Sequence, residues 1–582
     1  MSHPIERKRN DRRPRNAPSS ELPAPGWLMV GSLLLIFALS QYGYGIALPF
    51  VNDDYFFIDR ARADGLWGAI DPARSLFHWY RPISTGLHFW IVDHVSGGSA
   101  AGFHLANLIL WLGVQLLYWR IVRTVAGDAV ATLATAWSAA LAVWAVPILW
   151  PSGAQDLLVA LFGLSYVALM LEGRPAPALA AFGCALLSKE TAIVFPAIAT
   201  TLEIARGRPR RQAIAARTLE AGVTCLWIAL HPTLGARLLG PLRTDTVEVL
   251  HRESARATAL RSLGTAFNLD QMPRPDHVPL HAILSAVIGA TCLAWPVLRM
   301  ARRRPSFDSP TKVIAVGTAW ATIGLLVVLL PSIGWHPYYA LLGCMGASIV
   351  AAGALKRRIR VAAALLAVLV LLRTARGYTL STNWGDEAYH RRAGYVLRSL
   401  HEDLLAAHPH VAPGTRMYFA GIPDHIGFIA ADGPALRVWY DEPSVEGHYF
   451  SEYRPRIASR VSGTDAFFRF DQATGRLREI SPLKVDGSPT EIQDQELLAA
   501  TFLEGGDWKR ALDTYAALSI VAPRMDYSVL AATLLERTGR TREADSTYRW
   551  IAQRMAYPVT AVRESSRAML NEMMNARSHA ER

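Results

Sequence analysis

Long apolar runs constrain this chain more than any other feature of its sequence. Several segments before about residue 374 reach the roughly 20 apolar residues that a membrane-spanning helix needs, and 27–50 is the first of them. Of the 582 residues, 51% are hydrophobic and the mean hydropathy is +0.17, which is high for a soluble protein of this length. We therefore predict a polytopic α-helical membrane domain over residues 26–375, followed by a smaller soluble part.

Basic clusters give the predicted spans a direction, because Lys and Arg concentrate on the cytoplasmic side of a membrane. Counting from cluster to cluster predicts about 11 spans, including a hairpin of two short apolar pieces, 176–187 and 191–204, with Lys189 and Glu190 at its outer tip. The basic segment 1–25 is then a disordered cytoplasmic tail, and the C-terminal part lies outside. The clusters are Arg120 and Arg123, Arg206 to Arg211, Arg302 to Arg304, and Lys356 to Arg360.

The same clusters account for the net charge of +12, so the charge gives no indication of a nucleic-acid partner. The first span is long for a signal sequence and lacks a small-residue cleavage site, so we expect a retained anchor. The high content of Ala and Arg suggests a bacterial source. Together these features predict a multi-pass protein of a bacterial inner (cytoplasmic) membrane, with the bilayer as one of its partners.

The soluble part divides into two segments. Residues 376–490 carry strand-like runs at Arg416 to Ala420 and Leu436 to Tyr440, and a hairpin around 473–475, which predicts a small extracytoplasmic α/β domain. Residues 491–582 are helical and repeat: Gly506, Ala511 and Tyr515 recur as Gly539, Ala544 and Tyr548, each 33 residues later. That period is close to the 34 residues of tetratricopeptide repeats.

Two adjacent carboxylates, Asp53 and Asp54, follow the first span directly. Charges are costly at that depth unless they meet water or a cation. They open an extracytoplasmic loop, 51–100, in which the periodicity predicts two amphipathic helices, with a stop at Gly65 and a second start at Pro82. The pair is either an interfacial helix cap or a catalytic base held at the membrane face.

Other polar residues that interrupt the apolar pattern also fall on the predicted outer side. Singly, each has a structural explanation as a helix cap, an interhelical hydrogen bond, an interfacial aromatic or, for Lys189 and Glu190, a self-neutralising pair. As a set that converges on one face, they indicate a functional site. The set comprises Arg81, His88, His104, Asn107, Gln155, Asp156, Lys189, Glu190, Tyr338 and Tyr339.

Five motifs in this order carry a family resemblance. They are Val51-Asn-Asp-Asp-Tyr55, Trp79-Tyr-Arg-Pro82, Phe103-His-Leu-Ala-Asn107, Trp150-Pro-Ser-Gly-Ala-Gln-Asp156 and Leu186-Leu-Ser-Lys-Glu-Thr191. They resemble those of GT-C membrane glycosyltransferases, in particular the protein O-mannosyltransferases of the transmembrane-and-tetratricopeptide branch and, more distantly, the lipid A aminoarabinose transferase. The resemblance covers about residues 26–375 and, loosely, the repeats.

The resemblance implies a polyprenyl-phosphate sugar as donor. The acceptor stays open, since a hydroxyl of a protein, a lipid-linked glycan or a cell-wall polymer would suit an outward-facing site. The first acidic residue after the first span is the base in that family, which by position is Asp53, with Asp54 as the neighbouring acid. Arg81 takes the place of a residue that meets the donor phosphate, and Lys189, Glu190, Tyr338 and Tyr339 are further candidates for donor contact. Since the family often has Asp-Glu here, which carboxylate acts and whether a divalent metal takes part stay open.

The chemistry needs these residue types in any case. Attack by a hydroxyl requires a base, a phosphate leaving group requires nearby cations, and a single displacement inverts the anomeric carbon. The alternative is a non-catalytic membrane scaffold whose repeats bind a partner. A secondary transporter is the third hypothesis. It predicts charges near the bilayer midplane and inverted internal repeats.

Overall fold

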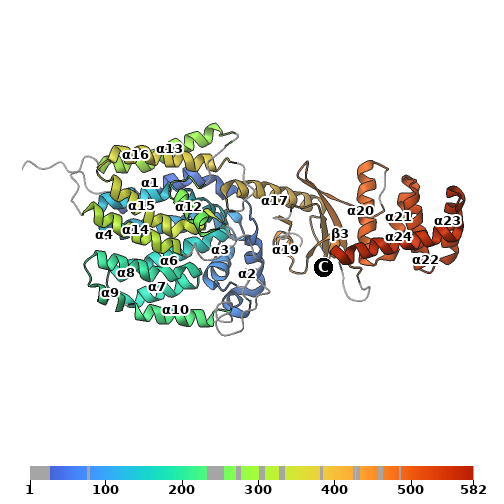
Figure 1. The fold of residues 1–582 in the computed structure, drawn as a ribbon, viewed down its shortest axis with the longest axis horizontal. Coiled ribbons are helices and arrows are strands. Elements are labelled where there is room, and N and C mark those ends of the chain that lie inside the picture. Colours follow the sequence, from blue (N-terminus) through green and yellow to red (C-terminus); the bar gives the residue numbers. More distant parts are fainter. Residues whose placement is uncertain are drawn as a thin grey trace, which may run out of the picture.

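A bundle of apolar helices forms one end of the molecule, and a long helix leads from it to a small sheet and a row of helices (Figure 1). In this computed structural model the described residues are 26–74, 79–215, 217–232, 254–270, 275, 277–300, 309–326, 335–379, 385–423, 426–427, 433–456, 463–483 and 487–580. The predicted basic tail, 1–25, and the arginines 302–304 lie outside them.

Each of the 11 predicted spans corresponds to a helical segment of the bundle. Gly127 takes a φ of 81° within α4, which bends that helix into two parts, and these parts match the second and third predicted spans. The helices are α1 (Trp27–Tyr42), α4 (Ala100–Ala139), α6 (Ala154–Leu171), α7 (Pro175–Leu186), α8 (Phe195–Ala205), α10 (Thr218–Leu230), α13 (Leu280–Met300), α14 (Pro310–Leu326), α15 (Leu341–Leu355) and α16 (Ile359–Arg376).

Within the described ranges, five helical stretches are long and apolar enough to cross a membrane by length and composition: Trp27–Ala47, Ala100–Ala139, Pro151–Leu171, Leu280–Met300 and Pro337–Leu355. Three further apolar helices, α7, α10 and α14, are shorter. The full number of crossings therefore stays a prediction.

The loop after α1 forms the two predicted helices. The first, α2 (Asp53–Ile70), is interrupted at Gly65, whose φ of 63° breaks the helix where the stop is predicted. The second starts with a π-helical turn, Pro82–Leu87, and continues as α3 (His88–Ser96). Both lie at the end of the bundle that faces the soluble part (Figure 1).

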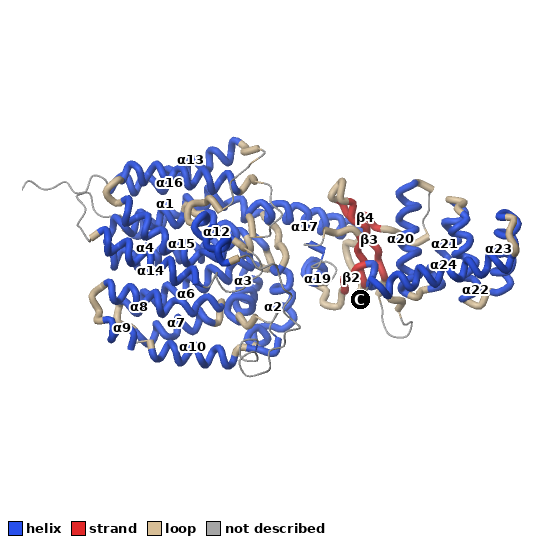
Figure 2. The backbone as a smooth tube through the Cα atoms, in the orientation of Figure 1, coloured by secondary structure: helices blue, strands red, loops and turns tan. Residues whose placement is uncertain are grey.

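The soluble part begins with α17 (Glu387–Ala407) and a four-stranded sheet (Figure 2). Its strands, β1 (Arg416–Ala420), β2 (Glu446–Tyr449), β3 (Asp465–Asp471) and β4 (Arg476–Glu479), lie in the order β2-β1-β3-β4. The strand β1 is parallel to both neighbours, and β3 and β4 form the predicted antiparallel hairpin. The sheet carries the α/β segment predicted for residues 376–490.

The predicted strand at Leu436 to Tyr440 is wrong, because this run is the helix α19 (Pro434–Tyr440). Pro434 at its first position presets the φ of a helix. The pattern of a five-residue apolar run fits a strand and a buried helical turn equally well. The helix α2, against which this run packs, lies 378 residues earlier in the chain.

The C-terminal helices are α20 (Pro489–Gly505), α21 (Trp508–Val521), α22 (Met525–Arg537), α23 (Thr541–Met555) and α24 (Val559–Ala580). The 33-residue spacing joins equivalent positions in them. Gly506 and Gly539 both take a φ of 80° after a helix end, Ala511 and Ala544 are both buried, and so are Tyr515 and Tyr548. Assignment to the tetratricopeptide class stays a prediction.

The soluble part is attached directly to α2. Arg437 of α19 makes a bidentate ion pair with Asp59, with N–O distances of 2.8 to 3.0 Å. The indole N–H of Trp439 donates to the hydroxyl of Tyr55 at 3.1 Å. At the junction with the bundle, the buried side chains of Arg373 and Glu387 pair at 3.0 Å. The helix that begins at Asp53 is thus held by the soluble part.

We predict that reversing the charge of Arg437 (Arg437→Asp) loosens this attachment by up to about 1 kcal/mol, because the pair is partly solvated. The double reversal with Asp59→Arg should restore it. Backbone hydrogen exchange of α19 measures the change. Arg540→Asp, which breaks a pair inside the distant repeats, is the matched control, and equally fast exchange in the single and double reversals would contradict the prediction.

Candidate functional site

The turn that ends at Asp54 is fixed by the Trp150-Pro-Ser motif. The indole N–H of Trp150 donates to the carbonyl of Val51 at 3.1 Å. Asn52 takes a positive φ of 54°, which Asn tolerates better than most residues, and its side-chain amide lies 3.2 Å from the hydroxyl of Tyr389. Two parts of the chain far apart in sequence therefore set the direction in which the two carboxylates point.

Asp54 is fully buried and its oxygens are occupied by hydrogen bonds. One oxygen accepts from the backbone N–H of Val51 at 2.8 Å. The other accepts from the backbone N–H of Ser152 at 2.8 Å and from its hydroxyl at 2.5 Å. Burial raises the pKa of Asp54 to about 8, although these hydrogen bonds lower it. Asp54 therefore joins α2 to the start of α6 and has a structural role.

Asp53 is half-buried. Among the described residues, no backbone or side-chain group donates a hydrogen bond to its carboxylate. Burial raises the pKa of Asp53 to about 6, and the positive charge of Arg81 opposes that rise. Its charge also acts on Tyr338 and Tyr339. The pKa of Asp53 therefore lies near neutral pH. Its carboxylate is close to one cation, Arg81, and to the phenol groups of Tyr338 and Tyr339.

Arg81 precedes the π-helical turn and is held by two partners. Its guanidinium makes three contacts of 2.5 to 3.0 Å with the carboxylate of Glu190 and one of 2.6 Å with the amide oxygen of Gln155. The pair with Arg81 lowers the pKa of Glu190 to about 2, against the opposing effect of burial. Trp79 lies against the guanidinium, with its ring centre 4.8 Å away.

Lys189 adds a second cation beside the same residues. Its ammonium contacts the carboxylate of Asp156 at 2.6 Å and lies 5.5 and 6.0 Å from the ring centres of Tyr338 and Tyr339. The predicted self-neutralising pair of Lys189 and Glu190 is therefore wrong. Lys189 pairs with Asp156 and Glu190 pairs with Arg81. The backbone at Lys189 is extended, so neighbouring side chains point to opposite sides of it.

Three of the predicted site residues have other surroundings. The amide of Asn107 donates to the carbonyls of Pro147 and Trp150 at 3.1 and 2.8 Å, and a ring nitrogen of His104 contacts the carbonyl of Leu48 at 3.1 Å. Both hold segments that carry the site. His88 is half-buried and its ring contacts that of Phe89, and desolvation lowers its pKa to about 4. No contact joins it to the described carboxylates or cations of the site.

Four residues at the site were not predicted: Asn52, Ser152, His231 and Tyr389. His231 lies 3.8 Å from the carboxylate of Glu190. Two of them, Asn52 and Ser152, lie inside the five motifs. A buried Asp54 needs hydrogen-bond donors, and this need could have directed attention to these neighbouring polar residues. His231 and Tyr389 stand alone in the sequence, and only the fold brings them to the site.

The described residues include no group of three or more His, Cys, Asp or Glu side chains that could hold a metal ion. The divalent metal that the resemblance allows therefore stays a prediction.

No protein-family model matches this chain, and no curated protein matches it. Among solved structures, the chain is similar to ArnT from Cupriavidus metallidurans in a crystal structure bound to undecaprenyl phosphate. The match has 15% sequence identity and a TM-score of 0.38, and it covers 72% of this chain and 84% of that one.

The two carboxylates should differ in their effect on stability. Asp54→Ala leaves three buried donors without an acceptor, so we predict a loss of roughly 2–4 kcal/mol in the free energy of unfolding. Asp53→Asn breaks no described hydrogen bond and should change that free energy by less than about 0.5 kcal/mol. Denaturant unfolding of the purified variants measures both. Equal destabilisation by the two substitutions would contradict the assignment of separate roles.

Proposed function

We propose that this protein is a glycosyltransferase that moves a sugar from a polyprenyl-phosphate donor to an acceptor hydroxyl at the outer face of the cytoplasmic membrane, with inversion of the anomeric carbon. One observation carries the proposal: Asp53, a carboxylate without a described hydrogen-bond donor, lies within the field of Arg81. Arg81 and Lys189 are each held by a carboxylate from another segment. The resemblance of the five sequence motifs supplies the donor class.

Asp53 is the proposed base. A general base needs an oxygen that is free to take the proton of the attacking hydroxyl, and its pKa must lie near the working pH. Asp53 meets both requirements, since its pKa is raised to about 6 and its oxygens are unoccupied by the described donors. Asp54 fails the first requirement, because its oxygens already accept three hydrogen bonds.

Arg81 and Lys189 are the proposed ligands of the donor phosphate. A guanidinium offers bidentate contacts and an ammonium a point charge, which suits the charge that develops on the leaving phosphate. In the structure both cations are held by carboxylates, Glu190 and Asp156. A donor phosphate would share or replace these contacts, and the carboxylates would keep the cations in place between turnovers.

Tyr338 and Tyr339 are proposed to line the sugar subsite, since phenol rings beside Lys189 and within the field of Asp53 offer both apolar faces and hydroxyls. Beside them, the helix path is broken: α7 ends at Leu186, and a 3-10 turn, Glu190–Val194, precedes α8. Irregular backbone inside a membrane domain occurs where it lines a site or cavity. This supports a binding site at the break.

A non-catalytic scaffold is the second candidate function, favoured by the helical repeats at positions 33 residues apart. Such repeats form surfaces that bind partners. A scaffold gives no reason for a half-buried carboxylate, Asp53, that has no described hydrogen-bond donor and a pKa raised to about 6. The repeats fit a transferase equally well as a surface that presents the acceptor.

The first test measures release of free polyprenyl phosphate from a panel of polyprenyl-phosphate sugars, in membranes that contain the protein and cell extract as acceptor. We predict that Asp53→Asn lowers the rate by at least about a hundredfold, because the loss of a general base costs 10²–10⁴-fold. Asp64→Asn, on the same helix and paired locally with Arg60, is the matched control. A wild type that consumes no donor, or an active Asp53→Asn, would favour the scaffold.

The second test is the pH dependence of kcat/KM. Below its pKa Asp53 is protonated and cannot accept a proton, so the rate should rise with pH and level off above about pH 6. Since Arg81 lowers the pKa of Asp53, Arg81→Gln should move the rising limb to higher pH in addition to weakening donor binding. A flat profile between pH 4.5 and 7 would exclude Asp53 as the base.

A further inference from the structure

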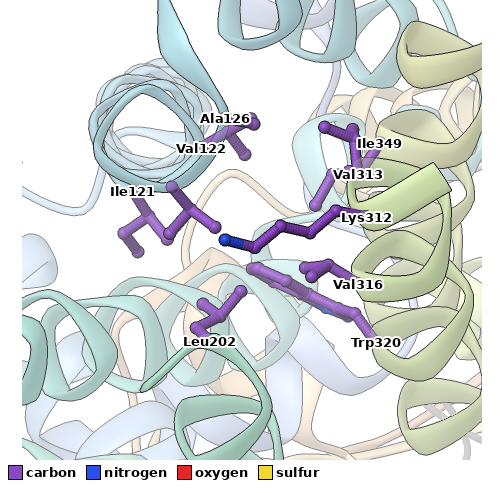
Figure 3. Close-up of a pocket in the computed structure, with 10 residues that line it drawn as sticks. Ile121, Val122, Ala126, Leu202, Lys312, Val313, Val316, Trp320 and Ile349 are labelled. Carbon is purple, nitrogen blue, oxygen red and sulfur yellow. The ribbon is translucent and has the colours of Figure 1, made fainter. Parts of the chain in front are cut away.

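A pocket within the bundle, between α4, α8 and α14, is too small for a ligand (Figure 3). Its lining is mostly apolar and includes Ile121, Leu202 and Trp320, and its volume of about 10 Å³ has room for about one water molecule. A different feature of the fold, around the turn that carries Asp53, bears directly on the proposed reaction.

The segment between the first span and Asp53 lies against α17, the first helix of the soluble part. Arg398 of α17 donates a hydrogen bond to the carbonyl of Ala47 at 2.6 Å. One turn earlier in α17, Gly394 lies so close to Pro49 that a Cβ on it would be 3.1 Å from the proline Cδ. The contacts approach Asp53 as α17 is followed back toward its start, so the segment and the helix run antiparallel.

The third contact of α17 with this segment is made at a strained backbone position. The hydroxyl of Tyr389 lies 3.2 Å from the side-chain amide of Asn52, and both residues are buried. Asn52 has a φ of 54° and a ψ of −122°, the angles of the second residue of a type II′ turn, which Gly adopts without strain. A residue with a side chain keeps such a conformation only where its surroundings hold it.

The first turn of α17 also lies beside the base and supports the other side of the turn. Burial raises the pKa of Tyr389, and the negative charge of Asp53 adds to that rise. The ring of the next residue, His390, lies against that of Trp150, with 5.5 Å between the ring centres, and Trp150 donates to the carbonyl of Val51. Both residues that precede Asp53 are therefore supported from α17.

The position of α17 is set by the soluble part. Its buried side chains Leu397 and Leu400 belong to the same apolar core as Phe468 of β3. The hydroxyl of Ser399 donates to the carbonyl of Gly475, in the hairpin of β3 and β4, at 3.0 Å. Because the later turns of α17 are held at the sheet, its first turn is a fixed support for the segment that carries Asp53.

We propose that Tyr389 is a positioning residue for the sugar transfer: its hydroxyl holds Asn52 in the positive-φ conformation from which Asp53 is presented to the acceptor hydroxyl. The soluble part thereby supplies a residue that the site needs. This role rests on the proposed function, in which Asp53 is the base. Since the donor phosphate is assigned to Arg81 and Lys189, loss of the Tyr389 hydroxyl acts on the chemical step and not on donor binding.

The test compares full-length variants in the release assay, with the polyprenyl-phosphate sugar that the wild type consumes. Tyr389→Phe keeps the ring and removes the hydroxyl. It should lower kcat by about tenfold to a hundredfold and change KM for the donor by less than about twofold, because a displacement of about 1 Å can cost that much rate. Tyr395→Phe, on the same helix but exposed, is the matched control and should leave both unchanged.

A second background separates this role from a general loss of packing. Gly takes a positive φ without strain and has no buried amide to satisfy. In an Asn52→Gly background, Tyr389→Phe should therefore lower kcat by less than about twofold. Full activity of Tyr389→Phe, an equal loss in both backgrounds, or a rise in KM with kcat unchanged would each overturn the proposal.

Hydrogen exchange of the purified full chain gives a readout that does not depend on the reaction. The backbone N–H groups of Asp54 and Tyr55 donate hydrogen bonds within the turn. Tyr389→Phe should speed their exchange about tenfold, whereas Tyr395→Phe should not. Unchanged exchange in Tyr389→Phe would overturn the proposal whatever the activity. Faster exchange in a chain that consumes no donor would show that Tyr389 holds the turn and that the proposed function is the part that fails.

Discussion

The buried contact between Asp54 and Ser152 is the interaction on which the site depends. Two adjacent carboxylates leave the first apolar helix at a depth where neither is well solvated. One of them is satisfied by three hydrogen bonds from Val51 and Ser152. Because successive residues at a helix start point in different directions, fixing Asp54 toward α6 directs Asp53 toward Arg81. Asp54 thus places Asp53, the proposed base.

The cations of the site are also held in place by residues from other segments. Arg81 and Lys189 are paired with Glu190 and Asp156, which come from other segments of the chain. A buried ion pair contributes little net stability but costs much when one partner is lost. Its value here is position, because each cation is held by a residue of another segment and Arg81 lies close enough to Asp53 to lower its pKa. The soluble part extends this arrangement, since Arg437 and Trp439 hold the helix that begins at Asp53.

The limits of prediction are clear at particular residues. The helices of the bundle could be predicted because each is an apolar run long enough to form a helix regardless of its neighbours. The strand predicted at Leu436 to Tyr440 failed because its short pattern fits both states, and its packing against α2 decided for a helix. The suggested pair of Lys189 and Glu190 was wrong because neighbouring side chains on an extended backbone point to opposite sides of it.

The sequence by itself determined the helical bundle, the side of it on which the polar residues gather, and the residue types available for chemistry there. Those properties follow from local composition and from the cost of placing charge in an apolar layer. Only the tertiary structure decided that Asp53 rather than Asp54 is unoccupied, that Glu190 belongs to Arg81, and that His231 and Tyr389 join the site. Hydrogen bonds between distant segments settle these points, and a sequence pattern does not contain them.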